Sequence, residues 1–172
     1  MLQAFDRKLE VTVGALVWVA CALIPCIFTM IVIDVSIRTI GFTPPLFTSS
    51  VVEYALLYIA MFSAPWLVRQ KGHVAIEAVV SNIPPKVREP LATIVYLVCA
   101  VVSFYFCWLS IELFIEAIET GNLDVRGIDM PYWLQFLPMP FGYGLVGLEF
   151  LMYLLGLRHY YTYDLGEVKD SV

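Results

Sequence analysis

The stretch VTVGALVWVACALIPCIFTMIVI, residues 11–33, runs for 23 residues without a charged side chain. A helix that crosses a bilayer needs about 20 mostly apolar residues, so this stretch is long enough to span. The apolar region of a signal peptide is shorter, about 7–15 residues, and ends at a small-residue cleavage site that is missing here. We therefore interpret residues 11–33 as an uncleaved membrane span.

Three further apolar stretches follow, at about residues 50–68, 91–113 and 138–157. The whole chain is 60% hydrophobic and 15% charged, whereas soluble domains are about 45–50% apolar and about 25% charged. These features predict an all-α integral membrane protein with four transmembrane helices. We expect residues 1–172 to form a single membrane domain.

The positive charges are divided unequally between the two sides of the predicted spans. One side, made of the N-terminus, the second connection and the tail, carries Arg7, Lys8, Arg69, Lys71, Lys86, Arg88, Arg158 and Lys169. The opposite side carries only Arg38 and Arg126. Because cytoplasmic connections are rich in Lys and Arg, we expect both termini to be cytoplasmic.

The connection between the second and third spans, residues 69–88, is too polar to span and too apolar for an ordinary loop. His73, Glu77 and Ser81 are spaced four apart, which places them along one helical stripe. This pattern predicts a short amphipathic helix over residues 73–83, lying in the membrane interface. It could serve only to cover lipid, or it could contact a larger membrane partner. The candidate interface residues are Arg69, His73, Glu77, Ile83 and Arg88.

Glu149 is the acidic side chain deepest in any predicted span. A charge at the centre of a membrane helix costs about 2.5–3.5 kcal/mol on insertion scales. We therefore expect Glu149 to be protonated, paired or turned toward protein. A hydrogen-bonded contact between helices is the preferred interpretation, and a proton or cation site is the alternative.

Three charged residues flank the first outer connection: Asp34 and Arg38 after the first span, and Glu53 at the start of the second. An ion pair of Arg38 with Glu53 or Asp34 would fix this hairpin. Direct contact with a partner protein is the alternative role.

Prolines and glycines gather at the start of the fourth span. They predict an interfacial turn over about residues 131–137, followed by the true span. Glycines allow close approach of a neighbouring helix. The candidate close-packing residues are Pro140, Gly142, Gly144 and Gly147. The preceding segment, residues 121–127, is interpreted as an exposed loop, either simply solvated or bordering a docking surface.

Several of these features occur in an order that resembles a known family, the small membrane subunit of tripartite ATP-independent periplasmic (TRAP) transporters. The similarity covers about residues 10–157. A departure from the pattern is Ala75, where family members commonly carry a basic or polar residue. The matching features are Arg38, Glu53, Arg69-Gln-Lys-Gly-His73-Val-Ala-Ile-Glu77, Ile83-Pro84, Met130-Pro131-Tyr-Trp133 and Pro138-Met-Pro140-Phe-Gly142.

The resemblance implies a protein of the bacterial or archaeal inner membrane that works with two partners. One is a large membrane subunit of about twelve helices, which carries substrate and sodium by an elevator-like motion. The other is a soluble periplasmic protein that binds an organic acid and delivers it. The small subunit would be a scaffold for the large one, in contact with membrane lipids, with no catalytic residues, no cofactor and no enzyme activity.

Other functional classes fit the sequence less well. A haem protein would need histidines inside spans, yet His73 and His159 lie at the ends, and the four cysteines form no metal-ligand spacing. The net charge of −5 and the lack of a basic run argue against nucleic-acid binding. Two alternatives stay open: a stand-alone four-helix carrier that uses Glu149, and the small subunit of another tripartite carboxylate uptake system.

Overall fold

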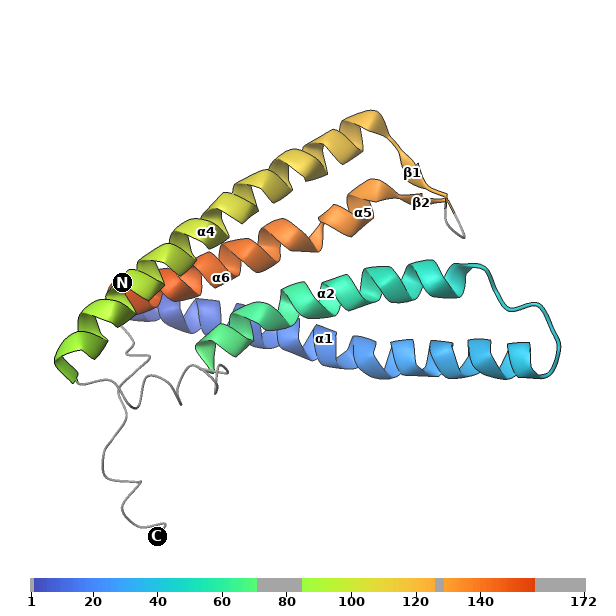
Figure 1. The fold of residues 1–172 in the computed structure, drawn as a ribbon, viewed down its shortest axis with the longest axis horizontal. Coiled ribbons are helices and arrows are strands. Elements are labelled where there is room, and N and C mark those ends of the chain that lie inside the picture. Colours follow the sequence, from blue (N-terminus) through green and yellow to red (C-terminus); the bar gives the residue numbers. More distant parts are fainter. Residues whose placement is uncertain (1, 71–84, 126–128, 157–172) are drawn as a thin grey trace, which may run out of the picture.

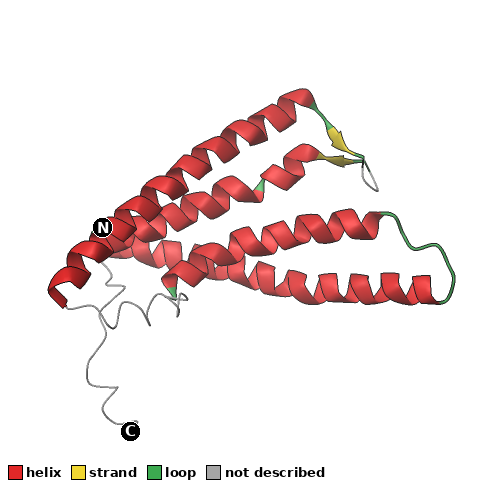
Figure 2. Ribbon diagram, viewed as in Figure 1, coloured by secondary structure: helices red, strands yellow, loops and turns green. Residues whose placement is uncertain are grey.

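The computed structural model describes residues 2–70, 85–125 and 129–156. The predicted amphipathic helix, with His73, Glu77 and Ile83, lies outside the described residues, whereas Arg88 falls in the first turn of a long helix. The elements in chain order are α1 (Leu2–Thr39), α2 (Phe47–Arg69), α4 (Pro85–Thr120), β1 (Leu123–Asp124), β2 (Met130–Pro131), α5 (Tyr132–Phe136) and α6 (Pro138–Leu154). Figures 1 and 2 show that helices dominate the described chain.

Four helical segments are long and apolar enough to cross a membrane, which confirms the predicted all-α membrane class. The helices extend beyond the predicted spans. The first is 38 residues long and the third is 36, corresponding to about 57 Å and 54 Å at about 1.5 Å per residue. Since the hydrocarbon core is about 30 Å thick, the polar ends of these helices continue past it or the helices are tilted.

The four long helices form two antiparallel hairpins, α1–α2 and α4–α6 (Figure 1). The hairpins converge at the end that holds the start of α1 and the end of α6, and they diverge toward the opposite end. Helix α2 packs against both α1 and α6, and α4 packs against α6. The neighbour order α1, α2, α6, α4 therefore makes α6 the link between the two hairpins.

The turn predicted before the fourth span is a short helix, α5, that ends where Pro138 begins α6. The amide of Leu137 still donates to the carbonyl of Trp133, which closes the last turn of α5. Proline fits the first turn of a helix because its missing N–H would have no partner there. The chain thus changes helix at Pro138 without leaving an amide donor unused at that position.

The segment that precedes α5 folds back on itself as a two-stranded antiparallel ladder. Leu123 pairs with Pro131, and Asp124 pairs with Met130. Asp124 is buried, so the prediction that this whole loop is exposed is wrong at that residue. The acidic side chain turns toward α2 instead of water, as described with the site below.

The close approach predicted for the glycines of α6 is seen at two of them. A Cβ added to Gly142 would lie 2.8 Å from the carbonyl oxygen of Met61 in α2. A Cβ added to Gly147 would lie 3.1 Å from the ring of Phe104 in α4. Because backbone cannot yield as a side-chain tip can, Gly142 sets the separation of α2 and α6.

We expect Gly142→Ala to lower the thermal midpoint of the purified chain in detergent. The added methyl group would force α2 away from α6, at a cost of about 1–3 kcal/mol for overpacking. Gly144→Ala is the matched control, because its Cβ would meet only the sulfur of Cys107 at 3.4 Å. Size-exclusion profiles after heating would measure both midpoints, and equal midpoints would contradict the role of Gly142.

Candidate functional site

One guanidinium group joins three helices where the hairpins converge. Arg69, the last residue of α2, donates to Glu149 of α6 at 3.1 Å. It also pairs with two carboxylates of α1, Glu10 at 3.2 Å and Asp6 at 3.6 Å. We call these four residues the arginine cluster. Arg69 is favourably placed at the C-terminal end of α2, because a cation there complements the negative end of the helix dipole.

The arginine cluster runs from the protein interior to its surface. The side chain of Glu149 is 0% exposed and that of Arg69 is 11% exposed, whereas Glu10 lies largely in the open. A buried carboxylate without a partner would cost several kcal/mol of desolvation. Arg69 offsets that cost at Glu149, and its remaining N–H groups reach the more exposed acids.

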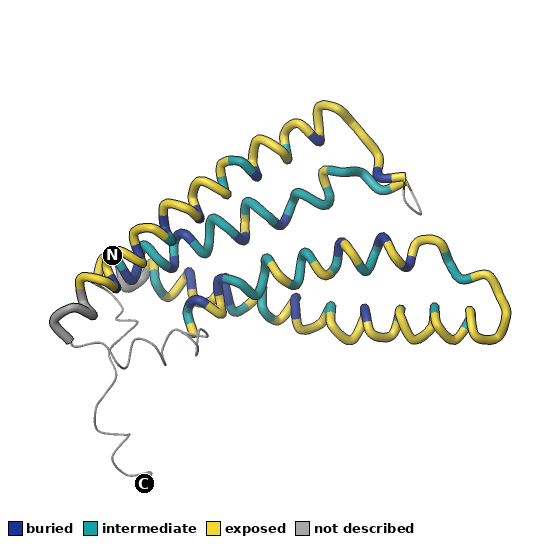
Figure 3. The backbone as a smooth tube through the Cα atoms, viewed as in Figure 1, coloured by how far each residue is buried: buried dark blue, intermediate teal, exposed yellow. Residues whose placement is uncertain are grey.

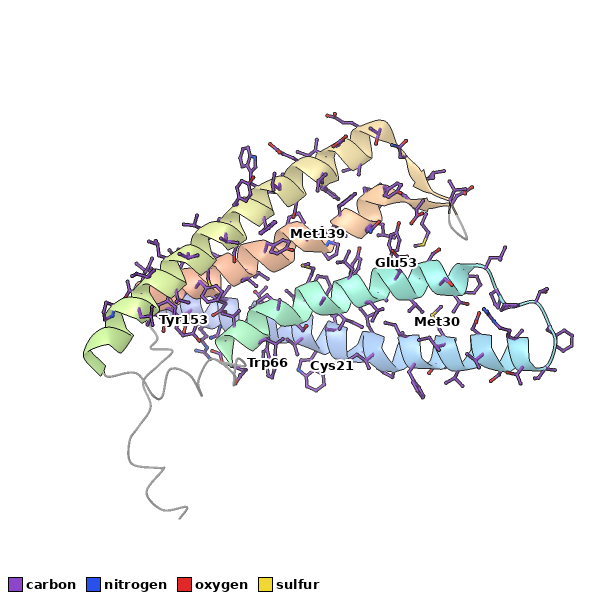
Figure 4. All side chains as sticks on the ribbon, viewed as in Figure 1. Cys21, Met30, Glu53, Trp66, Met139 and Tyr153 are labelled. Atoms are coloured by element: carbon purple, nitrogen blue, oxygen red, sulfur yellow. The ribbon has the colours of Figure 1, made fainter. Side chains whose placement is uncertain are left out.

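Two stacked tyrosines, Tyr153 of α6 and Tyr96 of α4, lie next to the arginine cluster. The hydroxyl of Tyr153 lies within hydrogen-bond distance of the backbone carbonyls of Val68 (3.3 Å) and Arg69 (3.2 Å), to which it can donate. These carbonyls belong to the last turn of α2, where helical partners run out. Tyr96 of α4 stacks on Tyr153 with ring centroids 5.6 Å apart. All four long helices therefore meet at this end, where Figure 4 labels Tyr153.

Apolar side chains close the space beside the arginine cluster. On one side, Leu9 and Val13 of α1 pack with Met152 of α6. On the other, Val68 and Ala92 pack with the two stacked tyrosines. The i, i+4 spacing of Asp6 and Glu10, of Leu9 and Val13, and of Glu149 and Tyr153 places each pair on one helix face.

The predicted ion pair at the opposite end of α1 does not link two helices. Arg38 pairs with Asp34 at 3.0 Å, one turn earlier in the same helix, and its side chain is exposed. Within the part of the chain that is described, no ion pair joins Arg38 to Glu53. The Asp34 alternative is the one observed, and a surface pair of this kind is worth only about 0–1 kcal/mol. This pair lies within α1 and therefore does not fix the α1–α2 hairpin, as an ion pair of Arg38 was expected to do.

Two tyrosines of α2 make the contacts that do hold this end together. The hydroxyl of Tyr58 donates to the carbonyl of Leu134 in α5 at 2.8 Å. The hydroxyl of Tyr54 donates to the buried carboxylate of Asp124 in β1 at 3.4 Å. Sequence reasoning missed both contacts. The one signal was the i, i+4 spacing of the two tyrosines, which gives α2 a polar edge inside an apolar span.

In the described residues the arginine cluster supplies ion pairs between helices. No group of three His, Cys, Asp or Glu side chains there could hold a metal ion. The four cysteines are free thiols. The deepest carboxylate, Glu149, is occupied by Arg69. The arginine cluster can therefore hold α1, α2 and α6 in register. The pairing with Arg69 accounts for the presence of a buried acid at Glu149.

We expect Arg69→Met to be the most destabilising single substitution at the arginine cluster. It would leave Glu149 buried without its cation, at a cost of about 3–5 kcal/mol. The double variant Arg69→Met/Glu149→Leu should recover part of that loss, because an apolar pair needs no counter-charge. Thermal midpoints in detergent would measure both variants, with Arg38→Met as the exposed control. A double variant less stable than Arg69→Met would refute the pairing.

Comparison with known proteins places part of the chain in a family. The family model described as tripartite ATP-independent periplasmic transporters, DctQ component, matches residues 27–158, more than half of the chain. The searches of curated proteins and of solved structures returned no significant match. The matched region includes the last third of α1 and all of α2, α4 and α6, with Arg69 and Glu149.

This family is a transporter component and not a class of enzyme, and its members are parts of multi-protein systems of the inner membrane. The motifs that resemble this family, from Arg38 to Gly142, all lie inside the matched residues. Together with the four membrane-spanning helices, the match shows that the chain belongs to the DctQ family, the small permease component of TRAP transporters.

Proposed function

We propose that this chain is a scaffold that braces the large membrane subunit of its transporter. The large subunit would carry an organic acid together with sodium, after a periplasmic binding protein delivers the acid. The observation that supports this role is how little the spans cover one another. At most 33% of the most apolar part of any span is buried within the described chain.

The exposed apolar surface is largest on the two outer helices. In the neighbour order α1, α2, α6, α4, each outer helix packs along its length mainly against one neighbour. Figure 3 shows exposed residues along the outer sides of α1 and α4. Lipid can cover such a surface, and so can the static part of a larger membrane protein. A layer with two broad faces and fixed internal contacts suits a brace.

The polar groups of the chain support a scaffold over a carrier. A carrier is expected to place ionisable groups or unwound backbone in the middle of the membrane, where they bind cargo. Here the deepest acid, Glu149, is held by Arg69 at 3.1 Å. The stand-alone carrier that uses Glu149 is therefore the less favoured alternative. Family membership also disfavours the small subunit of a different tripartite system.

We also propose that both termini and the arginine cluster lie on the cytoplasmic side. The support is the excess of Lys and Arg in the N-terminus, the connection 69–88 and the tail. In this orientation the β1–β2 ladder and the α1–α2 connection lie on the periplasmic side. The acidic residues of the third connection would then face the compartment of the binding protein.

Co-purification tests the scaffold role directly. The chain would be tagged at its C-terminus, expressed with its genomic neighbours and extracted in mild detergent. We expect a one-to-one complex with a polytopic protein of about twelve helices, identified by mass spectrometry. A chain that purifies alone and moves substrate in liposomes would overturn the proposal and favour the Glu149 carrier.

Reporter fusions test the orientation separately. A fluorescent protein that folds only in the cytoplasm should be bright when fused after Val172, and a phosphatase active only in the periplasm should be inactive there. Inserting the phosphatase after Gly121 should give activity, because that loop is expected outside. The reverse pattern would reject the orientation without bearing on the scaffold role.

A further inference from the structure

The connection between α1 and α2, residues 40–47, carries an unusual concentration of exposed apolar side chains. Ile40 is 71% exposed, Phe42 is 69% exposed and Leu46 is 77% exposed. Phe47, at the start of α2, is also exposed. We call residues 40–47 the tip loop. It lies at the far end of the α1–α2 hairpin, and Figure 3 shows this end exposed.

We propose that the tip loop inserts into the headgroup region of the leaflet farthest from the arginine cluster, and so anchors the α1–α2 hairpin to lipid. No charged residue occurs between Arg38 and Glu53. A solvated connection ordinarily carries charged side chains, whereas residues 39–52 carry none. The tip loop instead continues the exposed apolar surface of the spans on both sides of it.

The length of α1 determines the depth of the tip loop in the membrane. Glu10 belongs to the arginine cluster and is largely exposed, and Ile40, the first residue of the tip loop, is 30 residues further along the chain. At about 1.5 Å per residue this separation is about 45 Å along the axis of α1. The hydrocarbon core is about 30 Å thick, and the bilayer is about 40–45 Å thick with its headgroups. With Glu10 at the headgroup surface of one leaflet, the tip loop therefore falls at the headgroup level of the other.

The end of α1 satisfies its own backbone before the tip loop begins. The amide of Phe42 donates to the carbonyl of Ile37 at 3.1 Å, and the amide of Gly41 donates to that of Arg38 at 3.2 Å. Gly41 has φ +90°, the left-handed conformation that this helix ending requires. Polar backbone groups that are already bonded can enter the interface at low cost.

The remainder of the tip loop offers few donors to water or protein. Pro44 and Pro45 have no backbone N–H. The carbonyl of Pro45 accepts from both the amide and the hydroxyl of Thr48, at 3.5 and 3.3 Å. What remains free on the outside of the tip loop is mostly apolar side chain. This composition suits the membrane interface, where apolar side chains enter the boundary between headgroups and acyl chains.

The surface next to the tip loop supports the same occupant. Phe28, Val32 and Val35 are exposed on α1, within a helix long and apolar enough to span. Outside any contact with the large subunit, their surroundings in a membrane are acyl chains. The tip loop is continuous with this lipid-facing surface, and the Asp34–Arg38 pair lies where the two regions meet.

Nitroxide accessibility measures the depth of the tip loop. The four native cysteines would be replaced by alanine in the full-length chain, and a spin label would be attached at Phe42→Cys in phosphatidylcholine and phosphatidylglycerol vesicles. We expect the label to collide with oxygen, to be shielded from a water-soluble nickel chelate, and to lie about 5–10 Å below the headgroup surface. Phe28→Cys is the hydrocarbon control and Asn122→Cys, on an exposed loop, is the aqueous control.

Two outcomes would overturn the proposal. A label at residue 42 as accessible to the nickel chelate as the one at residue 122 would place the tip loop in water. A label shielded from both oxygen and nickel, in membranes where the whole transporter is assembled, would show that protein covers it. An intermediate depth with high oxygen accessibility supports lipid insertion.

A second variant avoids dependence on the cysteine replacements. Phe42→Trp, made in the chain with its cysteines intact, should gain fluorescence that is quenched by lipids brominated near the headgroup and less by lipids brominated near the chain end. The difference from the parent chain isolates the new indole from the four native ones. Adding Ile40→Glu and Leu46→Glu should abolish the quenching. Quenching unchanged by the two acids, or absent from the start, would reject insertion.

Discussion

The ion pair of Arg69 and Glu149 is the constraint on which the arrangement of the four helices depends. A carboxylate with no exposed surface in a membrane protein must be neutralised or matched by a cation. Arg69 supplies that cation from the last turn of α2, and it reaches α1 through Glu10 at the same time. In lipid there is no hydrophobic drive to bring apolar helices together, so directed polar contacts and close backbone approach decide which helices are neighbours.

Helix α6 receives most of these contacts, and this explains why the bundle can be open elsewhere. The arginine cluster and Tyr153 fix its end, Gly142 brings it against the backbone of Met61, and Gly147 faces the ring of Phe104. The adjoining α5 accepts from Tyr58 of α2. With α6 held at several levels, α1 and α4 can present their outer sides to lipid or to a partner without loosening the chain.

The sequence predicts the spans well because 23 uncharged residues leave little alternative to a membrane helix. It does not predict where the helices end, since residues such as Asp6 and Arg38, outside the apolar stretch 11–33, are still helical. Glu149 could be expected to need a partner, but Arg69 could not be identified as that partner before α2 and α6 were known to be neighbours. Asp124 was misjudged because an acid in a loop is ordinarily solvated, and only the fold brings Tyr54 to it.

The two ends of the α1–α2 hairpin are held by different physics, and this bears on how a brace could work. At one end Arg69 ties α2 to α6 through the buried ion pair with Glu149, and it reaches α1 through the more exposed Glu10 and Asp6. At the other end, Arg38 and Asp34 form an exposed pair within α1, and Tyr54 and Tyr58 of α2 form hydrogen bonds with β1 and α5. An apolar tip loop in the headgroup region would restrain the depth of that end, in addition to the contacts that α2 makes there. Such a hairpin would stay at a constant depth as a moving neighbour passes, and a static support in a fluid bilayer needs that property.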